Sequence, residues 1–152
     1  STSRRQRQMC IRDSGYTLEG RTRIHMELIK GIRQVIGDKS LFALRLGGCD
    51  YTVGGTTIED AVWACRRFEE AGVDLLDISG GTCCYARKGH NYPGYFGDIS
   101  EAVKKEVHIP VLLTGGVRIV QDAEMLLKEE KADMIGVGRI ITAKPDWGME
   151  LI

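Results

Sequence analysis

The sequence has little of what marks a membrane, nucleic-acid-binding or disulfide-stabilised protein. No apolar run in its 152 residues approaches the roughly 20 residues that a membrane-spanning helix needs. Basic and acidic residues balance, so the formal net charge is zero and no global attraction to polyanions is expected. The five cysteines are odd in number and lack the spacing of a disulfide framework. We therefore expect reduced thiols, no nucleic-acid or membrane partner, and a cytoplasmic protein.

A usable pattern of metal ligands is also lacking. Cys83 and Cys84 are adjacent, whereas paired zinc-binding cysteines are typically separated by about two to four residues. No metal site is predicted.

Glycine, in contrast, is abundant, and its 19 copies gather after apolar runs of strand length. Between these runs the apolar residues recur with a helical period, so helix and strand alternate four times. The predicted helices are 17–36, 58–72, a short one around 99–103 and another around 123–127. The predicted strands are 41–46, 73–79, 109–114 and 132–137. In the first helix one face carries Ile24, Leu28, Ile29, Ile32, Val35 and Ile36, and Thr56 with Glu59 is predicted to form a capping box for the second.

Two of the glycine-ended strands predict an anion site. The run at 109–114 stops at Gly115 and Gly116, and the next stops at Gly138 followed by Arg139. Backbone N–H groups at strand-to-helix turns bind anions, and barrels commonly hold a phosphate after their last two strands. Each residue alone is consistent with an ordinary turn or a solvated helix start. Together they favour a shared phosphate site.

The alternation predicts an α/β fold with a parallel sheet and right-handed crossovers. Four such units make half of a (β/α)8 TIM barrel, which needs roughly 250 residues when complete. We therefore predict the C-terminal half of a barrel over residues 15–152, within a larger protein and ending before the last covering helix. Residues 1–14 carry four arginines without periodicity. A basic nucleic-acid arm is one interpretation, but a disordered or non-native extension is favoured.

Arg45 is the most informative single residue, because it lies in a strand among apolar neighbours that should be packed. A guanidinium there needs a partner, since an unpaired buried charge is costly. One interpretation is a salt bridge to Asp77 on the adjacent strand. The other is a cation that faces the barrel mouth and contacts an electron-rich ligand.

The connection at 80–96 is long for a compact domain and is therefore expected to be functional or mobile. Its Tyr92 and Tyr95 are candidates for lining a substrate pocket, although loop aromatics often serve packing alone. Asp74 and Asp133 precede strands at the opposite end of the barrel, where a role in stability is expected.

The segment Gly15-Tyr16-Thr17-Leu18-Glu19-Gly20-Arg21-Thr22-Arg23 resembles the Gly-Gly-Ser-Leu-Glu-Asn-Arg-x-Arg segment of the Old Yellow Enzyme family of FMN-dependent NAD(P)H oxidoreductases. The resemblance departs from the family at Tyr16 and Gly20. It continues in order through Leu44-Arg45-Leu46, 70–74, 78–81, Ile109-Pro110-Val111, Thr114-Gly115-Gly116, 132–139 and Ala143-Lys144-Pro145-Asp146-Trp147.

This resemblance implies an FMN-binding TIM barrel that takes hydride from NAD(P)H and reduces an electron-poor alkene. It implies that Arg45 contacts the pyrimidine side of the flavin, and that Gly115, Gly116, Gly138 and Arg139 hold the FMN phosphate. The family's substrate-anchoring His/Asn or His/His pair and tyrosine proton donor have no match here, so the catalytic residues are expected in the preceding half of the barrel. Some members carry an iron–sulfur cluster whose cysteines would follow Ile152, so no prediction is made for it.

We expect the 152 residues alone to have no turnover. Two alternatives stay open. One is another phosphate-binding barrel, such as a sugar-phosphate isomerase or synthase. The other is a non-catalytic half barrel that associates with itself, or with a complementary half, to cover exposed strand edges.

Overall fold

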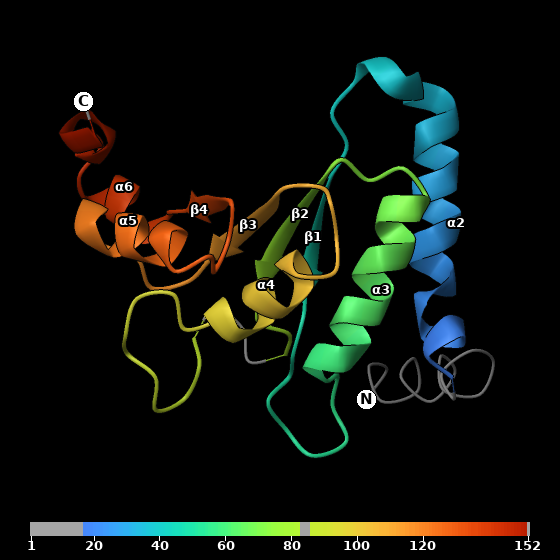
Figure 1. Ribbon diagram of the computed structural model, residues 1–152, viewed down its shortest axis with the longest axis horizontal. Helices are drawn as coiled ribbons and strands as arrows, with labels where there is room; N and C mark the ends of the chain where they lie inside the picture. The colour runs from blue at the N-terminus through green and yellow to red at the C-terminus, as the bar shows by residue number, and fades with distance from the viewer. Residues whose placement is uncertain (1–16, 83–85, 152) are drawn as a thin grey trace, which may run out of the picture.

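The computed structural model describes residues 17–82 and 86–151. The predicted extension at 1–14 and the Cys83–Cys84 pair lie outside these residues. The described chain forms a parallel sheet of four strands in the order β1-β2-β3-β4, connected through helices (Figure 1). The strands are β1 (Ala43–Gly47), β2 (Leu75–Ser79), β3 (Val111–Thr114) and β4 (Met134–Gly136). The α-helices are α2 (Leu18–Ile36), α3 (Ile58–Glu70), α4 (Gly97–Lys104), α5 (Val120–Lys128) and α6 (Arg139–Ala143), and the 3-10 helices are η1 (Gly37–Lys39) and η2 (Trp147–Leu151).

The two faces of the sheet differ in what covers them. Side chains alternate along a strand, so one set points to the helices and the other to the opposite face. The helix-facing set includes Leu76, Ile78, Val111 and Leu113, all fully buried. The other face carries Arg45 and Asp77, which are directly paired in the register of β1 and β2. No helix of the described chain covers this second face (Figure 1).

The core therefore lies between the sheet and the helices. Phe68 of α3, Ile99 and Val103 of α4, and the buried strand residues are 0% exposed and form one cluster. Burying a side chain of this size contributes about 1.5–3 kcal/mol each relative to exposure. This core fixes the direction of all four strands, so their carboxyl ends share one edge.

Helix α2 begins and ends close to the prediction. Thr17 caps it by accepting a hydrogen bond from the Gly20 N–H at 3.0 Å, and Gly37 follows its last residue with φ +62°. Its apolar face is mostly uncovered, however. Ile29 is buried, but the Val35 side chain is 86% exposed. Large parts of the side chains of Ile24, Leu28 and Ile32 are exposed as well. The helix lies at the β1 end of the strand order, with α3 on one side (Figure 1).

The capping box of α3 lies one residue later than predicted. Thr57 caps the helix and pairs reciprocally with Asp60, not Thr56 with Glu59. The reason is Asp50, whose carboxylate accepts from the Thr56 N–H at 2.8 Å and whose own N–H donates to the Thr56 carbonyl at 3.0 Å. Thr56 thus belongs to the preceding loop.

Across residues 17–82 and 86–151, no helix combines the length and the apolarity required to cross a bilayer.

Candidate active site at the carboxyl ends of the strands

The turn after β3 is built around two glycines with positive φ. Gly115 has φ +148° and Gly116 has φ +74°. The Tyr95 ring lies directly against them: a Cβ built at Gly116 would be 2.6 Å from Tyr95 Cε1, and one at Gly115 would be 3.0 Å from Cε2. The turn therefore requires glycine both for its backbone and for the approach of the ring.

The turn after β4 lies beside the turn after β3. Thr114 and Gly136 are directly paired in the parallel register, and each turn follows its paired residue within two positions. Gly138 caps α6, and Arg139 is the first residue of that helix. The Arg139 guanidinium donates from Nη2 to the Tyr95 hydroxyl at 3.1 Å. The structure thus brings the two predicted anion-binding turns together, with Tyr95 in contact with both.

Backbone donors remain available at these turns. Within the described chain, the N–H groups of Gly116, Gly138 and Arg139 donate to no protein acceptor. Buried or ligand-facing N–H groups normally find a partner, and orphan amides beside a cation are suited to an anion.

Arg45 lies on the face of the sheet that the helices leave uncovered. Its Nε is 3.5 Å from the Asp77 carboxylate, as in the first of the two interpretations of this residue. Its Nη2 donates to the Thr114 hydroxyl at 3.2 Å. The Thr114 hydroxyl in turn donates to Asp77 Oδ1 at 2.7 Å. The expectation that Arg45 is packed among apolar groups is wrong. Its side chain is 52% exposed, because Leu44 and Leu46 alternate with it and take the helix-facing positions.

The loop between β2 and α4 carries an aromatic and charged cluster. Arg87 pairs with Asp98 at 2.9 Å and lies 3.9 Å above the Tyr51 ring, whose hydroxyl donates to Asp98 at 2.8 Å. Burial, reinforced by the Asp98 carboxylate, strongly raises the pKa of Tyr51, so this phenol stays protonated. The cluster joins the loop after β1 to the start of α4.

The two candidate substrate tyrosines differ in exposure. Tyr92 is 49% exposed, and its hydroxyl is 2.9 Å from His90 Nδ1. Tyr95 is only 5% exposed and packs edge-on against Phe96, with ring centroids 4.6 Å apart. Tyr92 is therefore accessible to a ligand, whereas Tyr95 is buried against the glycine turn after β3.

A carboxylate already occupies the β1–β2 side of the same edge. Asp50 accepts hydrogen bonds from the N–H groups of Thr56 and Thr82. Partial burial acts to raise the pKa of Asp50, but these hydrogen bonds outweigh it and lower the pKa. Asp50 thus satisfies two amides on this side of the edge, whereas among the described residues the N–H groups of Gly116, Gly138 and Arg139 have no acceptor.

The opposite ends of the strands are closed by carboxylates. Asp74 accepts from the Phe42 N–H at 2.7 Å, and Asp133 accepts from the Val111 N–H at 2.9 Å. Both amides lie at or next to the start of a strand. The predicted structural role of Asp74 and Asp133 is consistent with these contacts.

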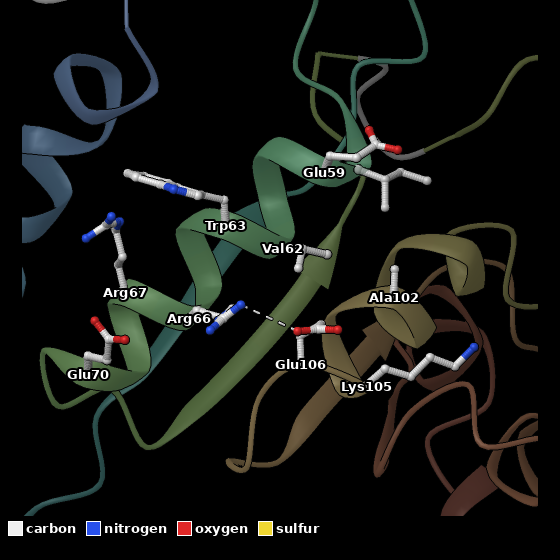
Figure 2. Close-up of a pocket in the computed structure, with 10 residues that line it drawn as sticks. Glu59, Val62, Trp63, Arg66, Arg67, Glu70, Ala102, Lys105 and Glu106 are labelled. Atoms are coloured by element: carbon white, nitrogen blue, oxygen red, sulfur yellow. Dashed lines mark ion pairs between the residues drawn. The ribbon is translucent and has the colours of Figure 1, made fainter.

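A separate groove of about 570 Å³ lies on the outer side, between α3 and α4. Figure 2 shows Arg66 reaching from α3 toward Glu106, with which it forms an ion pair of 3.6 Å. On the same helix Arg67 lies 4.0 Å above the Trp63 ring. None of the predicted site residues lines this groove, and it lies on the helical layer, not at the strand ends.

Among the described residues, no group of three or more His, Cys, Asp or Glu side chains is arranged to hold a metal ion.

The family model for the NADH:flavin oxidoreductase / NADH oxidase family matches residues 12–151. The chain belongs to this family. The match confirms the resemblance to Old Yellow Enzyme seen in the sequence and identifies the chain as part of a flavin-dependent NAD(P)H oxidoreductase family.

Curated relatives in the family carry related names. The chain is 31% identical over 137 residues to an NADH oxidase of Thermoanaerobacter brockii, covering 88% of this chain and 21% of that protein. It is 34% identical over 133 residues to an NADPH dehydrogenase of Geobacillus sp. (strain WCH70), covering 88% of this chain and 38% of the relative. The chain thus spans about a fifth to two fifths of these relatives.

Solved structures agree on the fold. A 2-naphthoyl-CoA reductase in complex with 2-naphthoyl-CoA matches with a TM-score of 0.80 and 26% identity, over 90% of this chain and 22% of that chain. Histamine dehydrogenase from Rhizobium sp. 4-9 matches with a TM-score of 0.74 and 21% identity, over 91% of this chain and 20% of that chain. Together with the family match, they show that the four strand–helix units are part of a (β/α)8 barrel.

One residue and one contact of the site were missed from the sequence. Thr114 was noted only as part of the glycine turn, and its hydroxyl proves to connect Arg45 with Asp77. The Tyr95–Arg139 contact joins residues 44 positions apart. The only available signal was that Thr114 immediately precedes the glycine pair at the same strand end.

Proposed function

We propose that the chain belongs to an FMN-dependent oxidoreductase that takes hydride from NAD(P)H and reduces electron-poor alkenes, and that it supplies the FMN phosphate site and the flavin-ring arginine. The observation that carries this proposal is the pairing of two adjacent glycine turns beside Arg45 on the uncovered face of the same sheet. These turns carry Arg139 and amides that have no protein acceptor within the described chain.

The described residues fit the phosphate of FMN. Gly115 and Gly116 keep the β3 turn free of side chains, while the N–H groups of Gly116, Gly138 and Arg139 lack protein acceptors in the described chain. Amides and a guanidinium together match a phosphate dianion, for which charge-assisted hydrogen bonds are strongest.

Arg45 fits the flavin ring. When bound, the flavin supplies the hydride chemistry and accumulates negative charge on its pyrimidine side as it is reduced. Asp77 and Thr114 hold the Arg45 guanidinium through Nε and Nη2, and in the described chain Nη1 has no partner and can donate to the ring. Asp77 and Thr114 therefore orient the cation, and Arg45 stabilises the added charge.

The other members of the reaction are assigned by exposure and by the family resemblance. Tyr92, accessible in the loop between β2 and α4, is the residue of this chain proposed to contact the substrate. The substrate-anchoring pair and the proton donor are proposed to lie in another part of the barrel. The related 2-naphthoyl-CoA reductase is named for a conjugated thioester, which supports an electron-poor conjugated substrate.

The chain is proposed to work only within a larger barrel. The exposed apolar face of α2 and the uncovered face of the sheet both need a partner layer, and the relatives are much longer than the matched region. The free thiols of Cys49 and Cys65 support a cytoplasmic setting. The family match favours flavin chemistry over a sugar-phosphate isomerase or synthase.

The test uses the complete barrel that contains this chain. After loading with FMN, anaerobic NADPH or NADH should bleach the flavin absorbance, and 2-cyclohexenone should restore it. Arg45→Gln should slow the bleaching at least about tenfold, which corresponds to about 1.4 kcal/mol of barrier. Arg66→Gln, which removes another half-exposed, ion-paired arginine, should not.

A flavin that is bleached by NADPH but not reoxidised by the enone would contradict the alkene substrate. Equal bleaching rates in Arg45→Gln and the unaltered protein would contradict the role of Arg45. Measurable turnover by the 152 residues alone would show that no further part of a barrel is needed.

A further inference from the structure

Arg139 differs from Arg45 and Arg87 in what holds it. Arg45 pairs with Asp77 and Arg87 pairs with Asp98, so each has an acidic partner. Arg139 has no carboxylate partner among the described residues, and its guanidinium donates to the Tyr95 hydroxyl. A hydroxyl orients a guanidinium and leaves its charge in full, whereas a carboxylate orients it and offsets part of that charge.

Tyr95 is itself held firmly from several sides. Its ring is almost fully buried between Phe96 and the glycine turn. The adjacent Gly94 N–H donates to the Gly115 carbonyl at 2.8 Å, and the Tyr95 carbonyl accepts from Arg87 Nη1 at 3.3 Å. The ring and its backbone are therefore fixed relative to β3, so the hydroxyl presents a defined acceptor to Arg139 at the start of α6.

We propose that Tyr95 is a positioning residue for the phosphate site: its hydroxyl holds Arg139 over the paired turns while leaving the full positive charge for the phosphate of the flavin. This inference rests on the proposed function.

The physical reason is preorganisation. A free arginine side chain loses much rotamer freedom when it binds an anion, and this loss weakens binding. A hydroxyl that already orients the guanidinium removes part of that loss before the ligand arrives. The Tyr95 ring also packs against the glycine turn that supplies amide donors. Tyr95 therefore contacts both kinds of donor at the site, the turn and the Arg139 guanidinium.

The test compares two ligands that differ only in the phosphate. FMN and riboflavin are titrated by flavin fluorescence into the same protein, and the ratio of their dissociation constants measures the phosphate contribution. Tyr95→Phe keeps the buried ring and removes only the hydroxyl. We expect it to weaken FMN binding by about tenfold, the size of one charge-assisted hydrogen bond, and to leave riboflavin binding unchanged.

Tyr51→Phe is the matched control. It also removes a tyrosine hydroxyl that contacts a charged group, from a ring that stacks on Phe96. It should leave the FMN-to-riboflavin ratio unchanged. A double-mutant cycle with Arg139→Gln then separates positioning from general packing: in the Arg139→Gln background, Tyr95→Phe should have no further effect on the ratio.

Each outcome decides one of the two proposals. If the unaltered protein shows no preference for FMN over riboflavin, the phosphate site proposed above is wrong and this inference falls with it. If it prefers FMN but Tyr95→Phe retains the same ratio, or still changes the ratio in the Arg139→Gln background, the phosphate site stands and the positioning role of Tyr95 is wrong.

Discussion

The two ends of the sheet differ in what accepts hydrogen bonds from their backbone N–H groups. At the amino ends of the strands, N–H groups are taken up by carboxylates of the protein: Asp74 for Phe42, Asp133 for Val111. At the carboxyl ends of β3 and β4, comparable N–H groups are left without a protein acceptor in the described chain, next to Arg139.

The difference separates stability from binding. An internal carboxylate satisfies an amide permanently and leaves nothing for a ligand. The N–H groups of a glycine turn beside a cation gain an acceptor only when an anion binds. The free energy of these hydrogen bonds therefore contributes to binding the anion. Substitutions at the amino ends should therefore change folding with little effect on ligand affinity, and substitutions after β3 and β4 should do the reverse.

The largest effect is expected for Gly116→Ala. At φ +74° an alanine is strained, and its Cβ would lie 2.6 Å from Tyr95 Cε1, so the ring and Arg139 must shift. We expect FMN binding to weaken on the order of a hundredfold, or about 2.7 kcal/mol, by fluorescence titration. Gly89→Ala is the control, because Gly89 has φ +80° but open space at its Cβ position. Equal losses in the two variants would show that backbone strain alone is responsible.

The next effect concerns the opposite end. Asp133→Ala leaves the buried Val111 N–H without its acceptor, which should lower the free energy of unfolding by about 1–3 kcal/mol in urea titrations. Asp133→Asn retains an acceptor oxygen and should lose less. The FMN-to-riboflavin ratio should stay unchanged in both variants. A changed ratio would mean that the two ends are not independent.

The smallest effect is in the acid range. Hydrogen bonds from the Arg33 side chain and the Phe42 N–H hold the pKa of Asp74 below its ordinary value. Because the folded pKa is lower than the unfolded one, the stabilisation is complete above the unfolded pKa of about 3.9 and is lost as pH falls through the folded pKa. Between pH 6 and pH 2, the melting temperature should therefore fall less steeply in Asp74→Asn than in the unaltered chain. Parallel curves would exclude Asp74 as an acid-sensitive group.

Periodicity predicted the elements well, because each one is specified locally. Helix α2 was expected at 17–36 and is found at Leu18–Ile36, and the fourfold alternation predicted the parallel order of the strands. The capping box was displaced by one residue because Asp50 draws Thr56 into its loop. That contact depends on loop geometry, which local sequence does not specify. For the same reason the partner of the apolar face of α2 is not encoded in the helix itself.

The site was predicted in its parts but not in its connections. The Arg45–Asp77 salt bridge, one of two interpretations open from the sequence, is present because adjacent strands bring the two residues together. Thr114 was missed because contacts across β2 and β3 depend on how the strands are staggered. The Tyr95–Arg139 contact depends on a long connection that folds back onto two turns, and neither composition nor period specifies that path. The flavin role of these residues stays a prediction.

The contacts among Arg45, Asp77 and Thr114 also bear on how the sheet assembles. In β3, Leu113 is buried beneath the helices and Thr114 reaches the opposite face. A slip of β3 by one residue would turn Leu113 toward the guanidinium and place a hydroxyl in the apolar layer. Both faces would then disfavour the misaligned sheet, so the contacts among Arg45, Asp77 and Thr114 help to specify the register of β3.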